Sequence, residues 1–451
     1  MNNAYKIGDS DTIFALASAQ GRAGVSIMRI SGPESAFVVQ GITNRSLPSA
    51  RKAILRKLKN NKGEIIDEAL LIFFKGPASF TGEDMVEFHT HGSIAVIENL
   101  SCVLFSLGLR QADPGEFTRR AFQNGKMDFT EAEGLADLID AETEGQRKQA
   151  LRQMQGGLKN EYENWRNKIL DSLAYVEGEI DFPDEDDVPD ALAQRAGPGL
   201  DSLLKTLDLF LKDSDRGSRV RHGVDIAIIG APNVGKSSLL NKLARRDAAI
   251  VSPQAGTTRD IVEVYLNLSG LSVRVSDTAG LRDAQDSIEA EGMRRTHLRA
   301  NEADLRIAVI DSFSPDLSVL ETLCEGDFIV YNKDDLVEIK PNLNTNNVSR
   351  ETFVVSVKTG SGVDELEMAL EKYVNNRFGI SELAGLTRAR HVTCVRTARE
   401  CIENAYGNLS YAPELSGADL RSALHAIKEL AGETDIESVL DRVFSSFCIG
   451  K

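Results

Sequence analysis

The chain has 451 residues, 42% of them hydrophobic and 27% charged, which is an ordinary composition for a folded globular protein. Its length predicts about two to four domains, each able to bury a core of its own. The net charge of −16 argues against a broad surface that coats nucleic acid, so any RNA contact should be local or shared with a partner.

The cysteines and the N-terminus indicate the compartment. Five cysteines are scattered without the paired spacing of a metal site, which predicts free thiols in a reducing environment. No secretion signal, organelle presequence or membrane-length apolar run is evident. We therefore expect a cytoplasmic protein that does not involve a membrane.

Residues 1–123 mix short β-like runs with Gly/Pro turns and two helical patterns, which predicts a compact α+β domain. Three of its segments, 21–33, 77–93 and 114–128, combine such turns with Arg, Glu or Lys. A small-molecule site and ordinary surface turns both have this composition, so both interpretations stay open here.

A helical region begins at Glu131. Apolar residues between Leu151 and Ile180 recur every three or four positions, which predicts one long helix with a core-facing stripe. A leucine-rich segment at 203–211 predicts a further helix. Residues 213–223 are predicted to be an exposed linker, although their arginines could instead contact RNA.

The apolar run 224–229 and the segment GAPNVGKSS after it are typical of a phosphate-binding loop between a strand and a helix. Glycines let backbone N–H groups close around a phosphate, Lys236 neutralises phosphate oxygens, and the Ser237 hydroxyl binds Mg²⁺. The sequence therefore predicts a nucleotide site. Its loop residues are Asn233, Val234, Gly235, Lys236, Ser237 and Ser238.

The segments after this loop alternate between strand and helix patterns, which predicts a parallel α/β sheet with ligands at the carboxyl ends of its strands. The predicted strands are residues 273–276, 305–310, 328–331 and 353–355.

Motifs at these strand ends indicate a guanine nucleotide. Asp277 can hold Mg²⁺ through water, and Thr258 is placed to reach the same ion. Asp335 can accept two guanine N–H groups, a donor pair that adenine lacks. The motifs together predict a GTPase. The further nucleotide contacts are Ser252, Thr257, Thr278, Ala279, Gly280, Asn332, Lys333, Ser356, Val357 and Lys358.

The catalytic group departs from the Ras pattern. Leu281 stands where Ras-type proteins carry a glutamine that orients the attacking water, so another group must act. Glu289 is the leading candidate, and an ordinary solvent-facing glutamate is the simpler interpretation of that residue. No arginine finger is evident, but Asn233 and the loop 252–257 could ligate a monovalent cation that supplies the positive charge.

Helical segments at 389–408, 417–430 and 435–447 follow the predicted sheet. Helices on both sides predict a multidomain α/β and α+β protein, in which a P-loop GTPase domain is inserted into a helical domain. The predicted domains are an α+β domain (1–123), a first helical part (124–217), a Ras-like G domain (218–379) and a second helical part (380–451).

These motifs closely resemble the MnmE (TrmE) family of tRNA-modification GTPases, as do FTGED, PGEFTRRAF and the terminal FSSFCIGK. The resemblance covers essentially the whole chain. It implies a homodimer formed by an N-terminal domain that binds 5,10-methylene- or 5-formyl-tetrahydrofolate, and GTP hydrolysis activated by K⁺. It also implies a heterotetramer with the flavoprotein MnmG. That complex adds a carboxymethylaminomethyl-type group to the wobble uridine of tRNA, with glycine or ammonium as second substrate.

The resemblance also implies roles for single residues. Glu289 matches the family's catalytic glutamate, acting together with Lys236, and Cys448 matches the family's terminal cysteine. The implied ligand sets are Arg29, Glu87, Lys126 and Lys451 for folate, Asn233, Ser252, Gln254 and Thr257 for K⁺, and Ser237 and Thr258 for Mg²⁺.

Two other functions stay open on the sequence alone. Ribosome-assembly GTPases of the Era/Der type, which act as RNA-binding switches, share the G-domain motifs. They should carry a basic RNA-binding domain, whereas the flanks here are acidic and helical. A scaffold that binds GTP without turnover is the third possibility.

Overall fold

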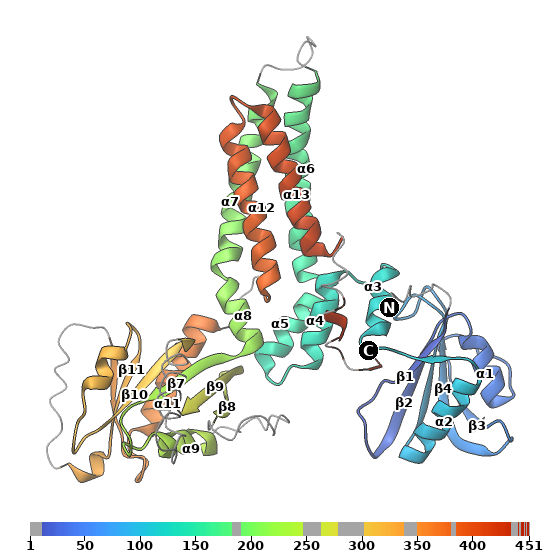
Figure 1. The fold of residues 1–451 in the computed structure, drawn as a ribbon, viewed down its shortest axis with the longest axis horizontal. Coiled ribbons are helices and arrows are strands. Elements are labelled where there is room, and N and C mark those ends of the chain that lie inside the picture. Colours follow the sequence, from blue (N-terminus) through green and yellow to red (C-terminus); the bar gives the residue numbers. More distant parts are fainter. Residues whose placement is uncertain are drawn as a thin grey trace, which may run out of the picture. The chain divides into compact units, whose positions relative to one another are not determined.

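The computed structural model describes residues 11–182, 191–246, 263–277, 302–337, 350–379, 385–433, 441, 443–445, 447, 449 and 450. The chain divides into two compact units (Figure 1). The first comprises residues 1–136 and 428–451, and the second residues 137–427. Each unit is described by itself.

The first unit is built on a six-stranded sheet. Its strands are β1 (Ile13–Leu16), β2 (Ala23–Ser31), β3 (Ala53–Lys59), β4 (Ile65–Phe74), β5 (Met85–Gly92) and β6 (Arg110–Gln111). They lie in the order β3-β4-β5-β2-β1-β6, and all neighbours are antiparallel except β1 and β6. The helices that begin in this unit are α1 (Ser35–Thr43), α2 (Ile94–Ser106), α3 (Glu116–Gln123) and α4 (Phe129–Ile139).

The two faces of this sheet differ because successive side chains of a strand point to opposite sides. One face carries the buried Met28, Ile30 and Phe88, which pack with apolar residues of α1 and α2. On the other face, Arg29, Glu87 and Ile72 lie directly opposite one another on β2, β5 and β4. That second face also contributes to a smaller apolar cluster with α3, made of Ile13, Ala15, Phe74, Phe80, Met85, Ala112 and Phe117.

The end of the chain packs on the same unit. Phe444 is buried, and its ring centroid lies 6.4 Å from those of Phe122 and Phe129. A side chain at Gly115, which has a φ of 69°, would collide with the Phe444 carbonyl. Ile449 bridges to Pro114. The last described residues are thus held beside α3.

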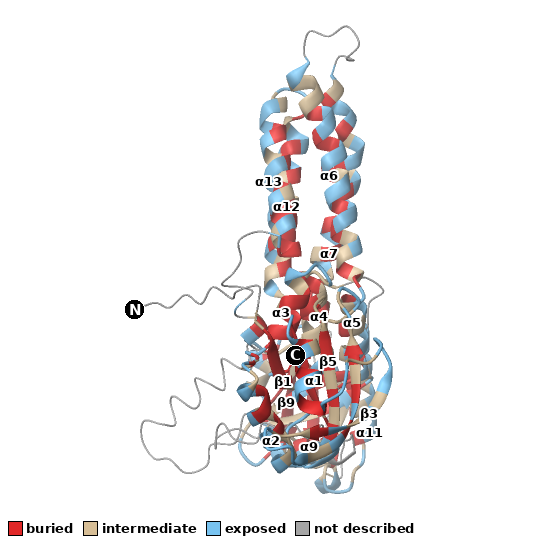
Figure 2. Ribbon diagram, turned by 90° about the vertical axis from the view of Figure 1, so that its right-hand side faces the viewer, coloured by how far each residue is buried: buried red, intermediate tan, exposed pale blue. Residues whose placement is uncertain are grey.

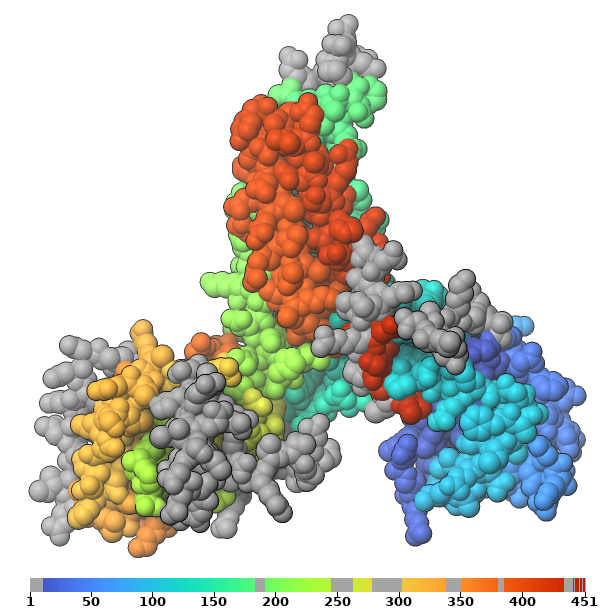
Figure 3. All heavy atoms as spheres, in the orientation of Figure 1, coloured from blue at the N-terminus to red at the C-terminus, as the bar shows by residue number. Residues whose placement is uncertain are grey.

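The second unit contains a bundle whose helices come from both sides of the nucleotide-binding sequence. Figure 3 shows α12 and α13, in orange and red, packed against the green α6 and α7, and Figure 2 shows buried residues along these helices. Trp165 of α6 is fully buried and meets Phe210 of α7 edge-on, with ring centroids 4.9 Å apart. The helices are α5 (Glu144–Met154), α6 (Gly157–Asp181), η1 (Leu192–Ala196), α7 (Gly197–Lys212), α8 (Ser214–His222), α12 (Ala389–Asn408) and α13 (Pro413–Ala431).

The prediction of one continuous helix from Leu151 to Ile180 is wrong. The chain breaks between α5 and α6 at Gln155 and Gly156, and Gly156 adopts a left-handed φ of 81°. Glycine tolerates this conformation, so two helices can share one apolar periodicity across a turn.

A six-stranded sheet forms the inserted part of this unit, in the order β12-β11-β10-β7-β9-β8. Its elements are β7 (Val224–Ile229), α9 (Lys236–Arg246), β8 (Glu263–Leu268), β9 (Leu271–Asp277), β10 (Leu305–Asp311), η2 (Ser318–Thr322), β11 (Phe328–Asn332), η3 (Asp334–Leu336), β12 (Glu351–Val354) and α11 (Val363–Phe378). The predicted strands are confirmed and parallel. The sheet is mixed, however, because the unpredicted edge strand β8 pairs antiparallel with β9.

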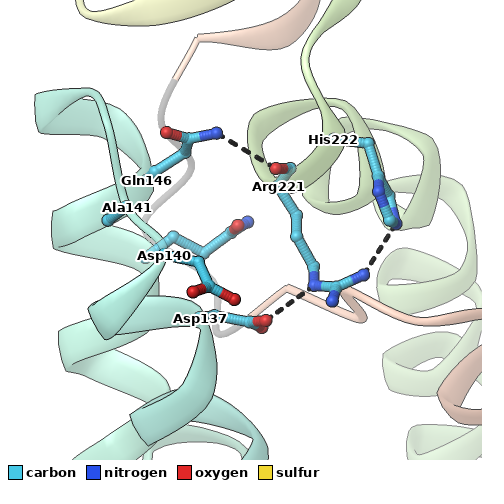
Figure 4. A pocket seen from close by; sticks show the side chains of 7 residues that line it. Asp137, Asp140, Ala141, Gln146, Arg221 and His222 are labelled. Atoms are coloured by element: carbon cyan, nitrogen blue, oxygen red, sulfur yellow. Dashed lines mark hydrogen bonds and ion pairs between the residues drawn. The ribbon is translucent and has the colours of Figure 1, made fainter. Parts of the chain in front are cut away.

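The predicted exposed linker at 213–223 is instead helix α8, and its Val220 is buried. Arg221 Nε donates to Asp137 Oδ1 at 2.8 Å, and Arg219 pairs with Asp304 at 2.9 Å. Figure 4 shows the Arg221 side chain between Asp137 and His222, and the Gln146 amide donating to the Arg221 carbonyl. The linker prediction failed because these acidic partners are distant in sequence.

Asp137 also binds Arg388, which follows the inserted sheet in the sequence. Arg388 Nη2 donates to the same Asp137 Oδ1 at 2.8 Å. We call Asp137, Arg221 and Arg388 the joint, because the two arginines stand where the chain enters and leaves the inserted part. One carboxylate therefore binds a residue at each of the two connections between the helices and the inserted sheet.

Replacing Asp137 with asparagine should loosen the joint. The variant keeps the shape of the side chain but removes the charge that pairs with both arginines. We expect amide hydrogen exchange in α8 and in the first turn of α12 to become about 10- to 100-fold faster, because hydrogen bonds to charged groups contribute about 1.5–3 kcal/mol. Hydrogen-exchange mass spectrometry on the full chain measures this change.

A matched control is Asp201→Asn, which removes the exposed Lys205–Asp201 ion pair on α7. Exposed pairs contribute little, so exchange at the joint should stay at the wild-type rate in this variant. Wild-type exchange in the Asp137 variant would contradict the proposed role of the joint.

Candidate functional site

The phosphate-binding loop lies between β7 and α9, as predicted. Gly230 and Gly235 have φ values of 145° and 102°, and Asn233 has a φ of 64°. A side chain at Gly230 would collide with the Val309 carbonyl, and one at Gly235 with the Asn332 amide. The loop can therefore turn in this space only with glycine at both positions.

Lys236 lies inside this loop. Its Nζ donates to the carbonyl oxygens of Gly230 and Ala231, each at 2.7 Å, and the side chain is buried. Burial lowers the pKa of Lys236 from its usual value, although the Asp277 carboxylate acts in the opposite direction. The ammonium group is thus held in a loop whose backbone suits a polyphosphate.

The two described candidates for Mg²⁺ binding come together at the carboxyl end of β9. Asp277 is buried at the carboxyl end of β9, and the Ser237 hydroxyl at the start of α9 donates to its Oδ2. Hydroxyl and carboxylate oxygens are the donors that Mg²⁺ prefers. The donor atoms of this pair therefore fit the ion that Ser237 is predicted to bind.

Asn332 connects the phosphate loop to the predicted base-binding motifs. Its Nδ2 donates to the Val234 carbonyl at 2.8 Å, and its Oδ1 accepts from the Val357 amide at 3.1 Å. The side chain is buried, so both bonds form away from water. One side-chain amide thus joins the phosphate loop, the segment that begins at Asn332 and the segment that contains Val357.

Asp335, which is predicted to select the base, is held by Ser356. The Ser356 hydroxyl donates to Asp335 Oδ1 at 2.7 Å, and Lys358 Nζ lies 3.8 Å from Oδ2. Ser356 itself is buried, and the Thr359 amide donates to its Oγ. Ser356 and Lys358 thus fix the orientation of the carboxylate that is predicted to bind guanine.

Sequence reasoning missed Asp311 at the end of β10. Its Oδ2 accepts from Lys333 Nζ at 2.6 Å, and Lys333 has a left-handed φ of 67°. Burial would raise the pKa of Asp311, but the hydrogen bond and charge of Lys333 outweigh it and lower that pKa. Its position at the end of an apolar strand could have indicated a site residue, because ligands gather at the carboxyl ends of parallel strands.

Several predicted site residues lie outside the described part of the chain. They are Ser252, Gln254, Thr257, Thr258, Thr278, Ala279, Gly280, Glu289, Cys448 and Lys451. Their predicted roles remain predictions. Ser238 is described and exposed in the first turn of α9.

The structure brings two predicted folate residues into contact in the first unit. Arg29 Nε and Nη2 donate to Glu87 Oε1 at 3.1 and 3.0 Å. The guanidinium carbon lies 5.5 Å from the ring centre of Phe80 and 5.8 Å from that of Phe117. Cation–π contacts of this kind hold an arginine in one orientation.

Lys126, a third predicted folate residue, lines an open hollow of about 680 Å³ on the same side of the sheet. Its Nζ donates to the Pro77 carbonyl at 2.9 Å. Ile72, the cross-strand neighbour of Glu87, lines this hollow too. The remaining lining residues are Arg51, Phe74, Ala78, Ser79 and Phe80. Aromatic and basic groups around such a hollow fit an aromatic ligand with carboxylates.

The described residues show neither a metal cluster nor a membrane-spanning helix. Within these ranges, no three His, Cys, Asp or Glu side chains gather as a metal cluster. No described helix combines the length and apolar character needed to cross a membrane.

The chain matches two protein-family models. One, described as the MnmE helical domain, matches residues 129–448, and the other, the GTP-binding protein TrmE N-terminus, matches residues 12–126. The G domain of the T. maritima FeoB iron transporter is 28% identical and covers 34% of this chain and 98% of its own, with a TM-score of 0.28. A score this low supports no comparison of folds.

Curated relatives match over nearly the whole length. The tRNA modification GTPase MnmE of Maricaulis maris is 50% identical over 443 residues, which is 98% of this chain and 99% of the relative. The protein of the same name from Caulobacter vibrioides is 47% identical over 448 residues, 98% of this chain and 100% of the relative. With this identity along both chains, and with the phosphate loop, Asp277 and Asn332 gathered at one edge of the inserted sheet, the chain belongs to the MnmE family of tRNA modification GTPases.

Proposed function

We propose that this chain is a K⁺-activated GTP hydrolase. With the flavoprotein MnmG, it would take part in the tetrahydrofolate-dependent addition of a carboxymethylaminomethyl-type group to the wobble uridine of tRNA. The observation that carries the proposal is the Asn332 side chain, which joins the phosphate loop to the guanine-binding motifs through two hydrogen bonds. A cytoplasmic homodimer that forms a heterotetramer with MnmG is part of the proposal, and so are the domain boundaries at 123/124, 217/218 and 379/380.

The residues of this chain would divide the work on GTP. Lys236 would exchange its two loop carbonyl acceptors for β- and γ-phosphate oxygens, which carry more negative charge. Ser237 and Thr258 would bind Mg²⁺, and Asp335 would select guanine. Glu289 would orient the attacking water in place of the glutamine of Ras-type proteins. A ribosome-assembly GTPase is not supported, since the family match covers nearly the whole chain.

K⁺ activation would depend on Asn233. The rate of GTP hydrolysis in potassium chloride should exceed that in sodium chloride at equal ionic strength. Asn233→Gly should lose about 10²-fold of the rate in K⁺, because a positive charge at the transferring phosphoryl group contributes on that scale. Glycine is chosen because it accepts the φ of 64° at this position while removing the side-chain oxygen.

Asn267→Ala, at an exposed position of β8, is the control and should keep the response to K⁺. Equal rates in the two salts would contradict K⁺ activation. The absence of any turnover in the wild type would favour a scaffold that only binds GTP.

Guanine selection gives a second test. Asp335→Asn should weaken GTP binding by roughly 10²-fold or more, because an amide offers a donor where guanine also presents donors. The same variant should bind XTP better than the wild type, since xanthine carries a carbonyl oxygen in place of the guanine amino group. Competition against a fluorescent nucleotide measures both affinities.

Asp334→Asn is the matched control at the neighbouring position, and it should leave the preference for GTP unchanged. If Asp335→Asn kept wild-type affinity for GTP, another residue would select the base.

Folate binding would use the hollow in the first unit. Lys126→Met should weaken binding of 5-formyl-tetrahydrofolate about 5- to 10-fold, because a partly exposed ammonium contributes about 1 kcal/mol to a carboxylate ligand. Titration calorimetry measures this affinity. Lys75→Met removes an exposed charge that does not line the hollow, so it should bind folate like the wild type. Equal losses in both variants would contradict a specific role for Lys126.

A further inference from the structure

The first unit carries a basic segment that none of the functions above uses. Residues 35–63 contain seven Lys or Arg and no Asp or Glu, in a chain whose net charge is −16. Six of these cations lie on β3 and the residues next to it, and we call them the basic edge. They are Arg51, Lys52, Arg56, Lys57, Lys59 and Lys62.

The basic edge is available for a ligand because β3 is the outermost strand of its sheet (Figure 1). Lys52, Lys57 and Lys62 are exposed. Within the part of the chain that the structure describes, no residue of the basic edge forms an ion pair. Among the described residues, the basic edge thus has no acidic partner comparable to Asp137, which binds both arginines of the joint.

The neighbouring strand β4 neutralises the basic edge only in part. Residues 51–75 contain seven basic and three acidic residues, a net charge of +4. Of the three acids, Asp67 accepts from both the backbone and the ring of His91, and Glu64 accepts from Asn60. Glu68 alone stands directly opposite a lysine, Lys57. A positive surface therefore remains on an otherwise acidic protein.

The basic edge is continuous with the candidate folate hollow. Arg51 belongs to both, since it lines the hollow together with Lys126. The side chains of Leu55 and Leu70 lie opposite each other on the same sheet face as Ile72, and both are exposed. A long anionic molecule lying along β3 would thus reach the hollow at the Arg51 end.

We propose that the basic edge binds the sugar-phosphate backbone of tRNA and guides it towards the hollow. Closely spaced cations without acidic partners are the chemistry that recognises a polyphosphate, and such contacts release counterions without reading the sequence. A second copy of this chain is a poorer occupant, because a twofold axis would set like charges against each other. This inference rests on the proposed function, in which tRNA is the substrate.

The test removes three exposed charges from the full chain. The variant Lys52→Gln, Lys57→Gln and Lys62→Gln should bind unmodified tRNA at least about tenfold more weakly at 100 mM salt. Its plot of log affinity against log salt concentration should also be shallower than that of the wild type by about 2, because each lost phosphate contact lowers the slope by about 0.7–0.9. Filter binding at four salt concentrations measures both quantities.

Two control variants distinguish the effect of positive charge on the basic edge from the effect of the net charge of the whole chain. Replacing Lys148, Lys205 and Lys372 with glutamine changes the net charge equally at exposed positions of the second unit, and should leave affinity and slope unchanged. The variant Lys52→Arg, Lys57→Arg and Lys62→Arg keeps the charges and should bind like the wild type. GTP turnover should stay at the wild-type rate in all three variants.

The outcomes distinguish the inference from the proposed function. Wild-type affinity and slope in the first variant would overturn the role of the basic edge while leaving tRNA as substrate. A change in its oligomeric state by sedimentation, with unchanged tRNA affinity, would also overturn it and assign β3 to a contact between copies. A wild-type chain that binds no tRNA even at 50 mM salt would overturn the tRNA part of the proposed function itself.

Discussion

The second unit depends on one carboxylate. The chain passes from the helices into the inserted sheet at one point and returns to the helices at another. These two points must stay close together for both parts to keep their cores. Asp137 meets this constraint by accepting from Arg221 before the sheet and from Arg388 after it. Its side chain is 11% exposed, so the charges are largely shielded from competing water. This three-residue ionic contact thus joins the nucleotide-binding sheet to its helices, together with the hydrogen bond from the Gly145 amide to the Gly270 carbonyl.

The nucleotide site depends in a similar way on one buried amide. Asn332 holds the Val234 carbonyl and the Val357 amide at hydrogen-bonding distance, so it connects the phosphate loop directly to the segments that are predicted to bind the base. Gly235 must lack a side chain because the Asn332 amide occupies that space. The charge of the Asp277 carboxylate also acts on Lys236 and raises the pKa of its ammonium group, against the larger effect of burial. These described residues are thus already hydrogen-bonded to one another without a nucleotide, which limits the entropy that they lose on binding.

The sequence predicted elements well where the physical cause is local, and failed where partners are distant. The predicted strand 273–276 and helix 389–408 follow from apolar periodicity, and the structure has them as β9 and α12. Helix α8 was predicted as a linker because the acids that pair with its arginines lie about 80 positions away, as Asp137 and Asp304 do. Strand β3 shows no clean apolar alternation, because Arg56 lies between Ile54 and Leu58 on its inner face, so only its pairing with β4 identifies it as a strand.

The sequence by itself determined the chemistry of the nucleotide site, since each motif is a short run whose glycines, hydroxyls and carboxylates act within one turn of the chain. It also indicated Arg29 and Glu87 as folate residues, but only through the resemblance to the MnmE family. Only the tertiary structure decided that these two side chains form an ion pair beside Phe80, and that Arg51 shares a hollow with Lys126. The reason is physical: strand pairing and register place residues 50 or more positions apart on one face, and no local pattern records which strand lies at the edge.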